Sequence, residues 1–286
     1  MADYFDPNNN GSYNQQNSQY PQYPQYQSNP QGQYDPQQMY QQQMYQQSMN
    51  RGAFQFAPGQ QQAYGGAVAA DVNDVLTKSF LFMFLALLVT GITSLIVARS
   101  TFWLSVVVNP APLIIFAILE IACVIGANVA MKKNNLPLSA VLFGAYSILN
   151  GVTLSIIFLA YELGSIVQVF FVAAAIFGAM ALIGATTKKD LTNLGMICII
   201  GLFGIIIASV VNLFLKSSGM DYVISIIGVV IFTGLTAYDV QKIKKLAATN
   251  VGYSPMVLGL YGAMELYLDF INLFLYLLRL MGKAKS

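Results

Sequence analysis

Residues 263–280 read AMELYLDFINLFLYLLRL, and this stretch decides the class of the fold. As a helix rising about 1.5 Å per residue, it is long and apolar enough to cross most of a hydrocarbon core of roughly 30 Å. Yet it carries Glu265 and Asp269, and a charged Asp at the centre of a membrane helix costs roughly 2.5–3.5 kcal/mol on insertion scales. Acids in such places face the interior of a helix bundle, pair with another group and mark a functional pathway.

The composition of the whole chain points to the same class. Of 286 residues, 56% are hydrophobic and 9% are charged, against about 25% charged in a soluble domain. The chain has no His, which excludes a Ser-His-Asp triad and any His-ligated metal site. Cys123 and Cys198 lie inside apolar runs and are expected to pack as small hydrophobic side chains. No basic cluster is interleaved with aromatic residues, so we expect no nucleic-acid partner. We also expect no cofactor.

The first 72 residues form a separate segment of low complexity. Its middle, YPQYPQYQSNPQGQYDPQQMYQQQMYQQ, contains almost no aliphatic residue. Such a composition buries too little apolar surface to offset the entropy lost on ordering, which predicts a disordered tail over residues 1–72 and a membrane domain over residues 73–286. The alternative is a segment that self-associates through its tyrosines and glutamines.

Seven apolar runs follow the tail, separated by turn and cap residues. The runs cover 79–98, 113–131, 138–160, 166–186, 194–215, 222–241 and 256–281. They lack the alternation of barrel strands, so they predict an all-α membrane protein with seven transmembrane helices. The sequences NPAP at 109–112, NNLP at 134–137 and YSP at 253–255 place Asn or Ser beside Pro near helix starts. Asp190 and Asp221 are expected to cap two further helices.

The distribution of Lys and Arg predicts the orientation. With the N-terminus in the cytoplasm, the outer loops hold only Arg99 and Lys216. The inner segments hold Lys78, Lys132, Lys133, Lys188, Lys189, Lys242, Lys244 and Lys245. This asymmetry favours a cytoplasmic N-terminus. Seven crossings then place Arg279, Lys283 and Lys285 outside, against the rule. Either the last segment re-enters or the earlier loops outweigh the C-terminal charges, and we favour seven crossings.

Four acids in these runs are the candidate site residues: Glu120, Asp239, Glu265 and Asp269. In the last run a polar stripe at helical spacing contains Tyr261, Glu265, Asp269, Asn272 and Tyr276. If this stripe meets the sixth run, Asp239 and Asp269 come close. Two carboxyl groups in a low dielectric cannot both ionise easily, so they would share one proton near neutral pH. Fully ionised, they would offer Ca²⁺ a pair of oxygen ligands.

Structural explanations compete with this interpretation. Asp239 can pair with Lys242, three residues along its own helix, and Glu120 can simply join two helices through Ser or Thr neighbours. Depth is a further difficulty, because Asp269 lies about 21 Å beyond Pro255 along a helix whereas Asp239 lies near the end of its run. Residue counting leaves the pairing open.

Two C-terminal motifs carry a family resemblance. FTGLTAYDVQKIKKL at 232–246 and LYLDFINLFLYLLRLMG at 266–282 resemble the signature of the Bax inhibitor-1, or transmembrane Bax inhibitor motif, family, including its bacterial members. The resemblance implies a seven-helix bundle with the last helix central. It also implies a pH-sensitive calcium leak channel, in which Asp239 and Asp269 form a di-aspartyl sensor and Glu120 matches an acid on the second helix. It further implies a basic latch on Asp239, for which Lys132 and Lys133 are the candidates, and a place in a bacterial plasma membrane.

The sequence is also compatible with two other functions. A non-transporting regulator would bind a membrane protease or another membrane protein, and the long tail suits such a role. An intramembrane aspartyl protease would also use two membrane aspartates. Here, however, Leu266, Tyr267 and Leu268 precede Asp269 where those enzymes have a Gly-x-Gly sequence. We therefore expect the protein not to be an enzyme, and we expect lipid, Ca²⁺ and other membrane proteins as its partners.

Overall fold

The computed structural model describes residues 71–103, 111–249 and 252–285. Residues 1–70 of the predicted disordered tail (1–72) and the predicted turn at Asn109 and Pro110 lie outside these described residues. For the last two tail residues the prediction is wrong, because Asp71 caps a helix that begins at Val72.

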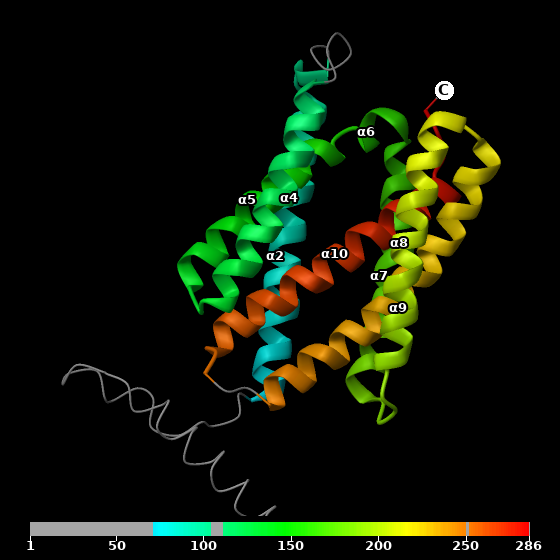
Figure 1. Ribbon diagram of the computed structural model, residues 1–286. Helices are drawn as coiled ribbons and strands as arrows, with labels where there is room; N and C mark the ends of the chain where they lie inside the picture. Colours follow the sequence, from blue (N-terminus) through cyan, green and yellow to red (C-terminus); the bar gives the residue numbers. More distant parts are fainter. Residues whose placement is uncertain (1–70, 104–110, 250–251, 286) are drawn as a thin grey trace, which may run out of the picture. The chain divides into compact units, whose positions relative to one another are not determined.

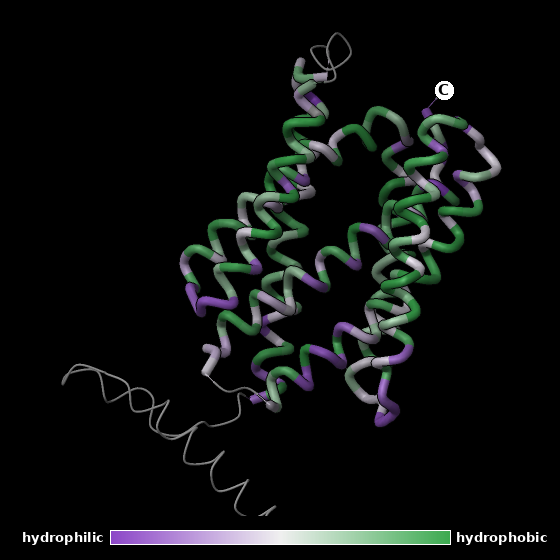
Figure 2. The backbone as a smooth tube through the Cα atoms, in the orientation of Figure 1, coloured by the Kyte–Doolittle hydropathy of each residue, from purple (hydrophilic) through white to green (hydrophobic). Residues whose placement is uncertain are grey.

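The described chain is built from long helices (Figure 1). They are α2 (Val72–Ala98), α4 (Ala111–Lys132), α5 (Leu136–Leu154), α6 (Ile157–Ala160), α7 (Leu163–Thr186), α8 (Thr192–Leu215), α9 (Ser218–Ala248) and α10 (Pro255–Met281). Seven spans in the described residues are long and apolar enough to cross a membrane, with α5 and α6 sharing the span Leu136–Ala160. The prediction of an all-α protein with seven membrane helices is confirmed, and Figure 2 shows the apolar residues running along these helices.

Local cap chemistry sets most of the helix starts. Asn135 accepts a hydrogen bond from the backbone N–H of Leu138, and Ser254 accepts one from Val257, as the Asn-Pro and Ser-Pro signals predicted. Asp71 caps α2, so this helix begins seven residues before the predicted run.

The two expected aspartate caps, Asp190 and Asp221, are not the cap residues of α8 and α9. The expectation for Asp221 is wrong, because Ser217 caps α9 and Asp221 lies in its first turn. Asp190 accepts hydrogen bonds from the backbone N–H and the hydroxyl of Thr192, although Leu191 is the cap residue of α8.

The last helix lies at the centre of the bundle. Within its membrane span 78% of α10 is buried, against 17% for α4 and for α8. It packs against α2, α9 and α7, and Figure 1 shows it crossing between the α2–α4–α5 group and the α7–α8–α9 group. The central position implied by the family resemblance is confirmed.

The end of α10 is tied to the connection before α7. The backbone N–H of Glu162 donates to the carbonyl of Lys283 at 3.0 Å, and that of Lys285 donates to the carbonyl of Ala160 at 3.0 Å. This contact lies at the end of the bundle opposite the loop that joins α7 to α8 (Figure 1). The last helix therefore spans the bundle instead of re-entering, as favoured from the sequence.

Candidate functional site

The polar stripe of α10 faces α9. At one end the ring of Tyr276 stacks on Phe232 with centroids 5.8 Å apart, and a Cβ atom on Gly228 would meet the same tyrosine ring at 2.6 Å. At the other end, the ammonium group of Lys242 lies 5.4 Å from the centroid of the Tyr261 ring. The two helices therefore run antiparallel with residue 239 opposite residue 269. The predicted meeting of the stripe with the sixth run is confirmed.

Asp239 and Asp269 lie in contact at the middle of this seam. Their exposed fractions are 5% and 4%, and their side chains are within hydrogen-bonding reach of each other. Oδ2 of Asp269 has no hydrogen-bond partner among the described residues. Two neighbouring carboxyl groups that are both buried require a shared proton or a cation to be stable.

The length of α9 explains how the two acids reach the same depth. The helix continues to Ala248, well beyond the end of the apolar run at residue 241. Asp239 is therefore about 13 Å from the end of its helix, at 1.5 Å per residue, and not at the end. The obstacle to pairing raised by the hydropathy pattern disappears because α9 continues for two turns, with Lys242, Lys244 and Lys245, beyond the apolar run.

Lys242 supplies the positive charge of the site. Its Nζ atom lies 3.4 Å from Oδ1 of Asp239 on the same helix and 3.2 Å from Oε1 of Glu265 on α10. The rings of Tyr238 and Tyr261 flank the ammonium group at 6.0 and 5.4 Å. Asp239 thus makes both contacts considered from the sequence, one to Asp269 and one to Lys242.

The predicted latch residues lie elsewhere. Lys132 and Lys133 are exposed at the end of α4. Among the ion pairs of the described residues, the cation beside Asp239 is Lys242. The expected latch from Lys132 or Lys133 is not formed in this conformation, because the segment after α4 is bonded through Asn134 to Gly252 and Ser254, just before α10.

Glu120 belongs to a different polar group of the bundle. Its Oε1 atom accepts a hydrogen bond of 2.8 Å from the hydroxyl of Thr153, so it joins α4 to α5 as the structural alternative proposed. Asn150 is a second hydrogen-bonding neighbour of Glu120. The structure does not bring Glu120 to the aspartate pair.

Sequence reasoning missed Tyr267 as the polar anchor of the other face of α10. Its side chain is fully buried, and its hydroxyl bonds to Oγ1 of Thr90 at 2.7 Å and to Oδ1 of Asn150 at 3.1 Å. Tyr267 is two residues from Asp269, so the two side chains leave α10 on opposite sides. The available signal was a tyrosine hydroxyl within a long apolar run, which needs a buried hydrogen-bond partner. The sequence could not identify these partners, because they lie on the distant helices α2 and α5.

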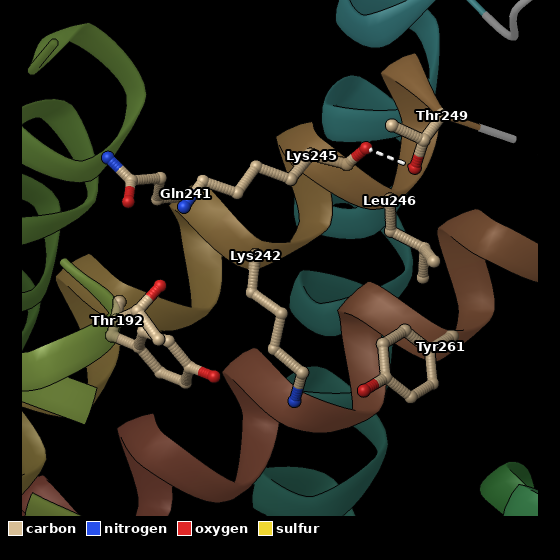
Figure 3. Close-up of a pocket in the computed structure, with 8 residues that line it drawn as sticks. Thr192, Gln241, Lys242, Lys245, Leu246, Thr249 and Tyr261 are labelled. Carbon is tan, nitrogen blue, oxygen red and sulfur yellow. Dashed lines mark hydrogen bonds between the residues drawn. The ribbon is translucent and has the colours of Figure 1, made fainter. Parts of the chain in front are cut away.

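A pocket of about 310 Å³ opens beside Lys242. It is lined by residues of α8, α9 and α10 and by the residue after α9: Thr192, Tyr238, Gln241, Lys242, Lys245, Leu246, Thr249 and Tyr261. In Figure 3 Lys242 and Tyr261 converge from α9 and α10, with Thr192 on the other side.

The neighbouring loop is held to α9 by side chains. Gln241 bonds to the backbone of Leu191 and of Lys189, at 2.8 Å each. Lys245 pairs with Asp190, and hydrogen bonds from Lys245 and Thr192 lower the pKa of this exposed carboxyl group to about 2.

Within the described residues no group of three or more His, Cys, Asp or Glu side chains is arranged to hold a metal ion. The assignment of Asp239 and Asp269 as Ca²⁺ ligands therefore stays a prediction.

Comparison with known proteins agrees with this architecture. The family described as "Inhibitor of apoptosis-promoting Bax1" matches residues 72–286. An uncharacterized protein of Borreliella burgdorferi is 41% identical over 217 residues, covering 75% of this chain and 94% of the relative. The inner membrane protein YbhL of Escherichia coli is 38% identical over 220 residues, covering 76% and 94%. The match spans all seven membrane helices, and this chain belongs to the Bax inhibitor-1 family.

Proposed function

We propose that the protein is a pH-sensitive calcium leak channel, gated by a proton shared between Asp239 and Asp269. The observation that carries the proposal is the contact of these two buried carboxyl groups across the seam between α9 and the central helix α10. No other pair of acids among the described residues joins these two helices so deeply in the bundle.

The shared proton ties α9 to α10. With one proton, one carboxyl group donates to the other and the two helices stay together. Without it, two negative charges face each other in a low dielectric and repel strongly. The seam then loosens, and the acids become hard oxygen ligands for Ca²⁺, which is the transported ion and not a resident cofactor.

Glu265 and Lys242 form the adjoining part of this gate. Lys242 neutralises Asp239 and Glu265 together, so it limits the charge that the seam must bear. Glu265 therefore adds an acid next to the aspartate pair on the side of the lysine-rich loops.

The test is Ca²⁺ entry into proteoliposomes between about pH 5 and 8, a range in which a perturbed carboxyl pair can titrate. We expect the wild-type flux to rise with pH, and the double variant Asp239→Asn/Asp269→Asn to lose this dependence. Asp71→Asn is the matched control, because Asn caps a helix as well as Asp does.

Three results would count against the proposal. Absence of Ca²⁺ flux at every pH would leave a partner-binding regulator as the better function. An unchanged pH profile in the double variant would remove the aspartates from the gate. A flux that rises on acidification would show that the Lys242–Asp239 ion pair, and not the shared proton, holds the closed state.

We also propose that the N-terminus and the lysine-rich loops lie in the cytoplasm of a bacterial cell, with the protein in the plasma membrane. The support is the excess of Lys in the segments at that end. A membrane-impermeant thiol reagent added outside should label Lys216→Cys and not Lys188→Cys. The reverse pattern would invert the orientation.

We propose a non-enzymatic role for the aspartates. The support is the burial of the two aspartates themselves, which are 5% and 4% exposed and so are closed to a substrate strand in this packing. Cleavage of a reporter helix by the wild type, and not by Asp269→Asn, would contradict this.

A further inference from the structure

The pocket between α8, α9 and α10 has a chemistry that the gate does not use. Among the described residues, the charged side chains of its lining are Lys242 and Lys245, and no carboxylate belongs to the lining. Tyr238 and Tyr261 contribute aromatic walls with hydroxyl groups, and Thr249 contributes a further hydroxyl group. A cavity with two ammonium groups and several hydroxyl groups suits an anion with several oxygen atoms.

Lys242 and Lys245 differ in the number and burial of their ion-pair partners. Lys242 is engaged by Asp239 and Glu265, which neutralise most of its charge. Among the described residues, the ion-pair partner of Lys245 is Asp190, and the side chains of this pair are 53% and 67% exposed. Exposed ion pairs contribute little to stability, so an anion in the pocket can replace Asp190 at little cost. Lys245 is therefore the principal cation of the pocket.

The position of the pocket favours a lipid headgroup over a soluble anion. Its lining on α9 runs from Tyr238 to Leu246, near the C-terminal end of that helix, and Gln241 of the lining bonds to the backbone of Lys189 in the lysine-rich loop before α8. Tyrosines gather where membrane helices meet the headgroup layer, and basic pockets between helices at this level bind anionic headgroups. Leu246 lines the pocket and is 36% exposed, which provides an apolar surface beside the phosphate position.

We propose that this pocket binds the phosphate group of an anionic phospholipid, held mainly by Lys245 with Lys242 as the second cation. The chemistry recognised is a phosphate ester, and the lipid is favoured over a soluble phosphate because the pocket opens between long apolar helices and has the partly exposed Leu246 in its lining. A bound phosphate competes with Asp239 and Glu265 for Lys242. Through this one residue, and only if the proposed gate is correct, lipid composition would influence the seam between α9 and α10.

Lipid binding to the detergent-purified full chain tests the proposal without any flux measurement. Native mass spectrometry would compare phosphatidylglycerol with phosphatidylcholine of the same acyl chains. We expect the wild type to retain phosphatidylglycerol and Lys245→Gln to bind it about tenfold more weakly, since the variant loses a hydrogen bond between charged groups. Lys245→Arg should restore binding.

Lys188→Gln is the matched control, because Lys188 is an exposed lysine in the same loop region that does not line the pocket. Equal loss in Lys188→Gln and Lys245→Gln would mean diffuse surface attraction and overturn the site. Equal retention of both lipids by the wild type would overturn it as well. Thermal stabilisation by inorganic phosphate as large as that by phosphatidylglycerol would reassign the pocket to a soluble phosphate.

Discussion

Lys242 on α9 and Glu265 on α10 form an ion pair of 3.2 Å across the seam that contains the aspartate pair. The same ammonium group lies 3.4 Å from Asp239. One cation thus serves two carboxylates from two helices, and this arrangement makes Lys242 the electrostatic centre of the site.

Replacing Lys242 by Gln should destabilise the protein by about 1–2 kcal/mol. The variant leaves Asp239 and Glu265 without their cation, and the cost stays below that of a fully buried pair because the Lys242 side chain is 34% exposed. The measurement is the thermal unfolding midpoint in detergent. Lys133→Gln, at the exposed end of α4, should leave the midpoint unchanged, and an equal loss there would restore the latch expected from the family resemblance.

Lys242→Gln should also shift the pH dependence of Ca²⁺ flux. Without Lys242, the nearby positive charge that favours the ionised form of Asp239 is gone. If flux rises with deprotonation, the midpoint of the rise should shift upward. A downward shift in the proteoliposome assay would contradict the arrangement of Lys242 beside Asp239.

Asp190 should titrate near pH 2 in the folded protein. Hydrogen bonds from Lys245 and Thr192 lower its pKa from 3.8 to about 2. Because the folded pKa lies below the ordinary value, the stabilisation is present above pH 4 and is lost as pH falls toward 2. Carbon-13 NMR of labelled Asp should show the pKa rising toward 3.8 in Lys245→Gln. An unchanged titration would mean that the ion pair does not persist in solution.

Tyr267→Phe should cost about 1–3 kcal/mol of unfolding free energy. The change keeps the ring but removes the hydroxyl group between Thr90 and Asn150, leaving buried polar atoms without a partner. Chemical denaturation in mixed micelles measures the loss. Tyr222→Phe, at a tyrosine that is 59% exposed on α9, should have almost no effect.

Gly184→Ala should separate α7 from α9. An added Cβ atom would lie 2.3 Å from the backbone oxygen of Ala237, and a backbone oxygen cannot rotate away. Overpacking of this kind costs roughly 1–3 kcal/mol. Gly178→Ala on the same helix meets nothing within 4 Å, so it should be neutral or slightly stabilising in the same thermal assay.

Much of the fold was predictable because it depends on short-range patterns. Apolar runs of sufficient length specify membrane helices, and Asn135 and Ser254 specify two of their starts. The polar stripe from Tyr261 to Tyr276 was also readable, since helical spacing alone places those residues on one face. The sequence predicted the contact of Asp239 with Asp269 only on the condition that the two helices lie at matching depths. The hydropathy of one helix does not give its depth relative to its neighbour.

By itself the sequence determined seven membrane helices, the caps at Asn135 and Ser254 and the face of the last helix that carries the acids, since each depends on residues within a few turns of one another. Only the tertiary structure decided which groups meet. It brought Lys242 rather than Lys132 or Lys133 to Asp239, and it separated Glu120 from the aspartates. The physical reason is that contacts between helices depend on crossing angles and on the offset of each helix along its neighbour. Those are set by the packing of all the helices around α10.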